Sequence, residues 1–351
     1  MTETDDQVPS PERTLTPLSV PAGGVPPIID TPDALAEACA RFAVGTGPVA
    51  ADAERASGFR YGQATYLAQF KREGAGIALI DTAALPDLRA FGEAVGDAEY
   101  VFHAASQDLP GMHDLGLEPA SIFDTELAAR LLGWPKVGLA AVVEQELGLV
   151  LAKEHSAQDW STRPLPHDWL AYAALDVEVL LELRALVGDH LAAAGKSEWA
   201  RQEFEAVRLA PLPEPRIDPW RRTAGTHVLR DARSLAIVKS LWEARDAEAR
   251  ERDTSPGRVL RDAAITAAAQ AKPTSVDRLS GRSVAFSAST QPSSDAWASA
   301  TPASWPCVIG LVLPALIARK RITGPGNGPR RLSTLRQMRW RAMSRQGGWD
   351  F

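Results

Sequence analysis

The sequence predicts an α/β domain with a mixed sheet flanked by helices, followed by a small all-α helical domain. From about Val25, short apolar runs alternate with stretches of helical periodicity. Three of these runs follow one another like strands of a meander before strands and helices mix, which favours a mixed sheet. Beyond the proline-rich segment LPEPRIDP, only helical patterns recur. A length of 351 residues also favours two or three domains.

Capping and turn residues bound the elements of the α/β domain. Thr31 is suited to cap the first helix because Pro32 can occupy its first turn. Glycine-containing or charged turns separate the three consecutive strands. Strands are expected at 25–30, 47–54, 64–70, 76–81 and 99–105, and helices at 31–43 and 86–95, from Ser106, at 126–134 and 138–148, and from about His167 through Leu191.

Composition shifts divide the chain into five segments. The last one loses helical and strand periodicity abruptly and is rich in basic residues, serine and proline, so it is interpreted either as a disordered basic tail or as out-of-frame translation. The segments are a flexible acidic and proline-rich arm 1–24, the α/β domain 25–210, a linker 211–219, the helical domain 220–281 with helices at 231–253, 256–271 and 274–281, and the tail 282–351.

The composition excludes several classes of protein. Hydrophobic residues make up 45% of the chain and charged residues 23%, which is typical of a soluble globular protein. The N-terminus lacks the basic start and apolar run of a secretory signal, so a cytoplasmic location is expected. Cys39 and Cys307 are far apart and outside any CxxC pair, which predicts neither a disulfide framework nor a zinc site. The apolar run 305–318 is shorter than the ~20 residues of a spanning helix, so no membrane partner is expected.

Two acids, Asp52 and Glu54, interrupt an apolar strand. Side chains repeat every two residues on a strand, so both carboxylates are expected on one face. Two carboxylates held together raise each other's pKa unless a cation lies between them, which favours a divalent metal. The alternative is an edge strand with solvated acids, since D-x-E triplets are common by chance.

Three residues farther along the chain are candidates for the same metal site. Asp108 falls in the first turn of a helix after an apolar strand, where an acid is also favoured by about 0.3 to 1 kcal/mol through the helix dipole. Tyr172 and Asp176 are four residues apart in a helical stretch and therefore share a face. That face is otherwise apolar, and a buried acid there requires a partner.

Together, the four acids and the tyrosine resemble the tyrosine-bearing branch of the DEDD superfamily of 3'-to-5' exonucleases. In the histidine-bearing branch a histidine stands five residues before the last aspartate, where this chain has Ala171. Through HAASQDL, FDTELAARLLG and DWSTRPLPHDWLAYAALDV, segment 25–210 resembles the nuclease domain of the ribonuclease D family, and 220–281 resembles its HRDC domain. The resemblance implies a ribonuclease H-like fold. Many family members continue into a second helical domain, which the tail does not resemble.

Two-metal hydrolysis of phosphodiester bonds is the chemistry that this resemblance implies. Two divalent cations, Mg²⁺ or Mn²⁺, would be held by four carboxylates, and Tyr172 would orient the attacking water. The implied activity is a 3'-5' exoribonuclease that trims structured RNA such as tRNA precursors, with RNA bearing a free 3' end as partner and a monomer as the favoured form. The implied catalytic residues are Asp52, Glu54, Asp108, Tyr172 and Asp176, of which the four acids are the metal ligands.

Five other residues are candidates for binding nucleic acid. Phe59 and Tyr61 could stack on bases or equally well pack in the core. Gln63 follows them, and His103 ends a strand, where a structural role is the better interpretation. Arg163 is a reasonable phosphate ligand.

Other functions stay open at the level of sequence. A 3'-5' DNA exonuclease would use the same acids, and recognition of a ribose 2'-hydroxyl would separate the two. A non-catalytic nucleic-acid-binding derivative or a truncated derivative is the alternative from another class. The formal net charge of -6 does not by itself support nucleic-acid binding.

Overall fold

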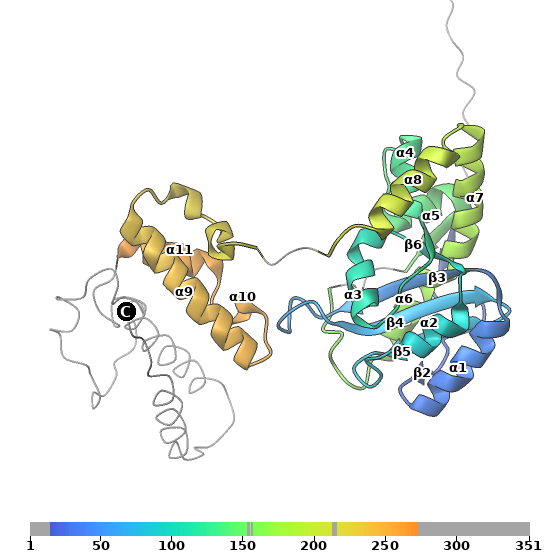
Figure 1. The fold of residues 1–351 in the computed structure, drawn as a ribbon, viewed down its shortest axis with the longest axis horizontal. Coiled ribbons are helices and arrows are strands. Elements are labelled where there is room, and N and C mark those ends of the chain that lie inside the picture. The colour runs from blue at the N-terminus through green and yellow to red at the C-terminus, as the bar shows by residue number, and fades with distance from the viewer. Residues whose placement is uncertain (1–14, 153–154, 156, 213–215, 273–351) are drawn as a thin grey trace, which may run out of the picture. The chain divides into compact units, whose positions relative to one another are not determined.

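The structure is a computed structural model of the chain, and it describes residues 15–152, 155, 157–212 and 216–272 (Figure 1). These residues form two compact units, an α/β unit that comprises residues up to 219 and 246–261, and a helical unit that comprises residues 220–245 and those from 262 onward. The helix expected at 274–281 and the tail 282–351 lie outside the described residues.

A six-stranded mixed sheet forms the centre of the α/β unit, in the order β2-β5-β4-β3-β6-β7. Strands β3, β4 and β5 pair antiparallel, whereas β2 on β5, β6 on β3 and β7 on β6 pair parallel. The predicted mixed sheet is therefore confirmed. Its strands are β2 (Ile28–Ile29), β3 (Thr46–Arg55), β4 (Thr65–Glu73), β5 (Gly76–Asp81), β6 (Glu99–Phe102) and β7 (Ser121–Asp124).

Helices cover both faces of this sheet. Thr31 caps the first helix as predicted, because its hydroxyl accepts a hydrogen bond from the amide of Ala34 at 3.3 Å. The helices of the α/β unit are α1 (Pro32–Val44), α2 (Arg89–Val95), α3 (Leu109–Asp114), α4 (Thr125–Leu132), α5 (Leu139–Leu147), α6 (His167–Glu178), α7 (Leu180–Ala193) and α8 (Ser197–Arg208).

The alternation of side chains along β4 separates the two faces. Phe70 points toward α1 and α2, where its ring centroid lies 4.6 Å from that of Phe91, and the ring of Phe91 lies 4.9 Å from that of Phe42. Leu67, three residues away and on the opposite face, belongs to a buried cluster with Ala173 and Ala174 of α6. Helix α6 packs across β3, β4 and β5. Consequently, the odd-numbered side chains of β4 face α6.

Two segments differ from the sequence-based expectation. The arm expected to be flexible over 1–24 contains a strand, β1 (Thr16–Leu18), which pairs in parallel with β8 (Leu149–Leu151). This pairing gives the backbone groups of a short segment hydrogen-bond partners that no local pattern reveals. The single helix expected over 167–191 is divided at Val179 into α6 and α7. The division separates a helix on the sheet from one that packs on α4 and α5.

Three helices follow the linker, namely α9 (Ala232–Glu251), α10 (Pro256–Val259) and α11 (Asp262–Ala271). Buried apolar residues of α9 and α11 include Ile237, Leu241 and Ile265, and the Ser234 hydroxyl of α9 donates to the carbonyl of Ala269 at 3.1 Å. The all-helical character expected for this segment is confirmed over the described residues. Within those same residues, every helix is too short or too polar to cross a membrane.

Candidate metal centre and active site

Strand β3 carries the first two acids of the site. Asp52 lies opposite Gln69 of β4 and Glu54 opposite Leu67, so both acids are on the face that α6 covers. The side-chain amide (Nε2) of Gln69 donates a hydrogen bond to Oδ2 of Asp52 at 2.7 Å. The expectation that the two acids share one face is met, and the shared face points into the protein, because Glu54 is only 7% exposed.

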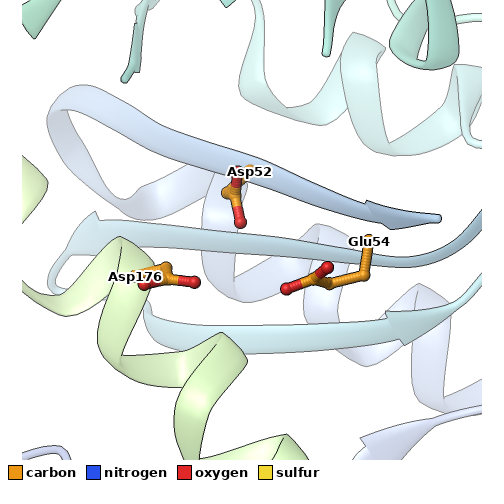
Figure 2. A group of neighbouring side chains, drawn as sticks. All are labelled: Asp52, Glu54 and Asp176. Carbon is orange, nitrogen blue, oxygen red and sulfur yellow. The ribbon is translucent and has the colours of Figure 1, made fainter. Parts of the chain in front are cut away.

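Helix α6 brings a third carboxylate to this pair. Asp176 is 8% exposed and lies on the side of α6 that faces β3 and β4 (Figure 2). One carboxylate oxygen each from Asp52, Glu54 and Asp176 lie within 4.8 Å of one another. Residues more than 120 positions apart in the chain therefore form a compact set of oxygen donors.

Asp108 lines one cavity together with these three acids, but its carboxylate has a different partner. It directly precedes α3, is 5% exposed, and pairs through Oδ1 with Nη2 of Arg55 at 3.5 Å. It is not one of the three carboxylates that lie within 4.8 Å of one another. The cavity has a volume of about 590 Å³ and is also lined by Tyr172. All five residues that the sequence proposes as catalytic thus border one space.

Burial sets the protonation of these acids. Loss of hydration is the main cause that raises the pKa of Glu54 to about 10, and the neighbouring carboxylates of Asp52, Asp176 and Asp108 contribute to this rise. Burial is also the main cause that raises the pKa of Asp52, Asp108 and Asp176. Carboxylates this close can all be ionised near neutral pH only if cations offset their charge.

The donor set fits hard divalent cations. It consists of carboxylate oxygens without thiol or imidazole in the close trio, which is the chemistry that Mg²⁺, Mn²⁺ and Ca²⁺ prefer. Buried acids with raised pKa values and few compensating hydrogen bonds are what such a site is expected to look like without its ions. The residues present therefore fit a divalent metal centre.

Tyr172 lies one helical turn before Asp176 and stays a phenol. Burial is the main cause that raises its pKa, and the nearby Asp176 and Glu54 add to the effect. A phenol with a raised pKa is a hydrogen-bond donor and a poor general base. This environment favours a role in orienting a ligand or a water molecule over a role in taking up a proton.

Two of the five candidate nucleic-acid contacts also line the cavity, namely Phe59 and His103. Nδ1 of His103 lies 2.9 Å from the hydroxyl of Thr125, which in turn donates to the carbonyl of Phe102 at 3.1 Å. Burial lowers the pKa of His103, so the ring is neutral at pH 7. Since the Thr125 hydroxyl already donates elsewhere, Nδ1 is the donor to it.

The other three candidates do not line the cavity. Tyr61 and Gln63 lie in the loop between β3 and β4, where Oε1 of Gln63 accepts from the hydroxyl of Ser57 at 2.7 Å. The guanidinium of Arg163 makes two contacts of 2.6 Å with Asp81 and donates to the carbonyl of Tyr66 at 2.9 Å. Its donors are therefore used within the fold, and the structure gives Arg163 a structural contact in place of the expected phosphate.

Residues outside the five proposed as catalytic also shape the site, among them Asp124, for which the resemblance implies a supporting role and not metal binding. The carboxylate of Asp124 caps α4 by accepting from the amide of Glu126 at 2.9 Å, and it accepts from the amides of Ala104 and Ala105 at 3.0 and 2.9 Å. It thereby fixes the turn that leads to Asp108. The pattern D-T-E at the start of a helical run is a capping signal that agrees with this supporting role. Nothing local indicates the contact of Gln69 with Asp52.

Comparisons with known proteins agree with this geometry. Residues 26–191 match the family model for a 3'-5' exonuclease, and residues 234–282 match the model of the HRDC domain. Ribonuclease D of Escherichia coli strain K12 is 31% identical over 261 residues, which cover 72% of this chain and 68% of that protein. Ribonuclease D of Shewanella sp. strain ANA-3 is 34% identical over 212 residues, which cover 59% of this chain and 54% of that protein.

Solved structures share the fold. A protein from Bifidobacterium adolescentis is 42% identical, with a TM-score of 0.74, and the match covers 94% of this chain and 83% of that chain. The crystal structure of Escherichia coli ribonuclease D is 27% identical, with a TM-score of 0.59 and coverage of 89% and 79%. The sequence matches span from about half to two thirds of the length of the curated relatives. With a ribonuclease H-like exonuclease fold and an HRDC domain, the chain belongs to the ribonuclease D family.

Proposed function

We propose that the chain is a 3'-5' exoribonuclease that hydrolyses phosphodiester bonds at the free 3' end of structured RNA, such as a tRNA precursor. The observation that carries the proposal is the convergence of Asp52, Glu54 and Asp176 within 4.8 Å, beside Asp108 and Tyr172 in one cavity. The related Escherichia coli protein is described as an exoribonuclease involved in structured RNA processing, which supports RNA over DNA as the substrate.

Two divalent cations, Mg²⁺ or Mn²⁺, would be held by the four acids, because all of their donors are hard oxygens. Bound cations would supply charge neutralisation at the phosphate and a more acidic water. The protein's own residues then do the positioning. Gln69 fixes the carboxylate of Asp52 through its 2.7 Å hydrogen bond, and the Tyr172 hydroxyl orients the water next to Asp176. Phe59 borders the cavity as a surface on which a terminal base can stack.

The test is degradation of end-labelled single-stranded RNA and DNA of the same sequence, with Mg²⁺, with Mn²⁺ and with EDTA. Stepwise shortening of RNA from its 3' end, abolished by EDTA and by Asp52→Asn, is the expected result. Asp87→Asn is the matched control, because Asp87 pairs with Arg89 on the surface and does not line the cavity. Endonucleolytic or metal-independent cleavage would contradict the proposal, and equal degradation of DNA would contradict the choice of RNA.

A further inference from the structure

Arg55 stands out in the cavity because of its charge. The acids that border the cavity are Asp52, Glu54, Asp108, Glu126 and Asp176. Among the described residues that line this space, Arg55 is the one lysine or arginine. A polyanionic strand that enters such a cavity meets carboxylates on most sides, so a fixed positive charge inside it is of value for binding.

The end of β3 directs Arg55 to this position. Consecutive residues of a regular strand point to opposite faces, so Glu54 and Arg55 would be expected on opposite sides of the sheet. The register with β4 shifts by one residue at this point, from Glu54 opposite Leu67 to Arg55 opposite Thr65. The extra residue, Tyr66, belongs to β4, and Arg55 is the last residue of β3, where the regular alternation of the strand ends. The guanidinium of Arg55 contacts Gln107 and Asp108, and Glu54 and Arg55 both line the cavity.

The contacts of Arg55 leave part of its guanidinium available. Nη1 donates to the carbonyl of Gln107, and Nη2 lies 3.5 Å from Oδ1 of Asp108. A charge-assisted hydrogen bond between guanidinium and carboxylate is usually about 2.7 to 2.9 Å long, so the contact with Asp108 is a loose ion pair. The side chain is 24% exposed, and a guanidinium has five N–H donors, more than these two contacts use.

We propose that Arg55 is a substrate-binding residue that contacts a phosphate of the RNA strand in the cavity. The inference rests on the proposed function, which supplies the phosphate. Asp108 is also one of the acids that fit a divalent cation, and a carboxylate engaged by a cation attracts a guanidinium less strongly. The backbone phosphate is then the anion that remains for Arg55, and the fork of the guanidinium suits two phosphate oxygens.

The test is equilibrium binding of a 3'-terminal single-stranded oligoribonucleotide to the full chain, measured by fluorescence anisotropy over a series of KCl concentrations. Ca²⁺ replaces Mg²⁺, because it takes the same oxygen ligands, and a gel checks that the RNA stays full length. Each phosphate contact on a single strand contributes about 0.7 to the slope of log K against log salt. Arg55→Gln is expected to lower the magnitude of that slope by about 0.7, and Arg55→Lys, which keeps the charge, is expected to retain it.

Arg184→Gln is the matched control. Nε of Arg184 pairs with Oε1 of Glu99 at 2.7 Å, and Arg184 does not line the cavity, so its loss should leave the slope unchanged. If Arg55→Gln does not fold, Arg55→Met, which keeps the aliphatic stem, is measured in its place. If the uncharged variant, Arg55→Gln or Arg55→Met, has the same salt slope as the wild type, the proposal is overturned and Arg55 is only a partner of Asp108. Failure of the wild-type chain to bind RNA would count against the proposed function instead.

Discussion

Gln69 of β4 holds Asp52 of β3 across the sheet, with its amide nitrogen 2.7 Å from the carboxylate oxygen. The two residues are partners in the antiparallel register, and Gln69 is fully buried. This hydrogen bond lowers the pKa of Asp52 against the larger, opposite effect of burial. One side chain of the sheet therefore orients the acid at the centre of the site, whereas burial has the larger effect on the pKa of that acid.

Gln69→Leu is expected to reduce RNA degradation by about 10- to 100-fold, because groups that orient metal ligands commonly contribute that much to metal affinity or activity. The loss should shrink at high metal concentration, so the activity is measured over a titration of Mg²⁺. Gln145→Leu on the exposed surface of α5 is the control, since Gln145 does not line the cavity. Equal activity of Gln69→Leu and wild type at limiting Mg²⁺ would contradict this role.

The thermal stability of the metal-free protein is expected to fall as the pH rises from about 5 to 9. Burial raises the pKa of Glu54 from 4.5 to about 10, so between these values the folded state binds more protons than the unfolded state. Stability is then greatest below the unfolded pKa and is lost as the pH approaches the folded one. The measurement is Tm against pH in EDTA.

Two variants sharpen this pH experiment. Glu54→Gln is expected to flatten the dependence, because the amide has no proton to lose, whereas Glu144→Gln on the exposed surface of α5 should leave it unchanged. Added Mg²⁺ is expected to raise Tm. At a free Mg²⁺ concentration of 100 times its Kd, the free energy of unfolding should increase by about 2.7 kcal/mol. A Tm of the metal-free wild type that rises over this pH range would show that the acids are not buried together.

Tyr172→Phe is expected to slow turnover by about 10²- to 10⁴-fold, the usual range for the loss of an acid/base or orienting group. Because Tyr172 is not one of the carboxylate donors, binding of Mn²⁺ should change little. Single-turnover RNA degradation and Mn²⁺ titration are measured on the same preparation. Tyr100→Phe is the control, since Tyr100 is buried in β6 away from the cavity. Wild-type turnover in Tyr172→Phe would remove this hydroxyl from the mechanism.

Arg163→Gln is expected to lower the stability of the α/β unit by about 1 to 3 kcal/mol, because it leaves the carboxylate of Asp81 buried without its ionic partner. The salt dependence of RNA binding should remain that of the wild type. Urea unfolding and the anisotropy series test the two parts separately. Arg201→Gln serves as the control, because the Arg201–Glu198 pair is on the exposed surface of α8 and neither residue lines the cavity. A reduced salt slope in Arg163→Gln would restore the phosphate contact that the sequence suggested.

Local periodicity accounts for much of the site. The two-residue repeat of a strand places Asp52 and Glu54 on one face, and the helical repeat places Tyr172 next to Asp176. Both relationships involve residues at most four positions apart, so they can be read from the chain directly. The order of apolar runs and capping residues also predicts the mixed sheet and Thr31 as a cap, both of which the structure confirms.

Relationships between residues distant in the chain depend on the tertiary structure. The sequence alone determined the class of fold, the acids and their two local pairings. Only the fold decided that Asp108 faces Arg55, that Arg163 forms an ion pair with Asp81, and that residues 16–18 pair with 149–151. The physical reason is that local repeats fix the direction of a side chain relative to its own element. The partner that it contacts is fixed by strand order, register and helix packing. These bring together segments whose local sequence patterns do not indicate that they will be in contact.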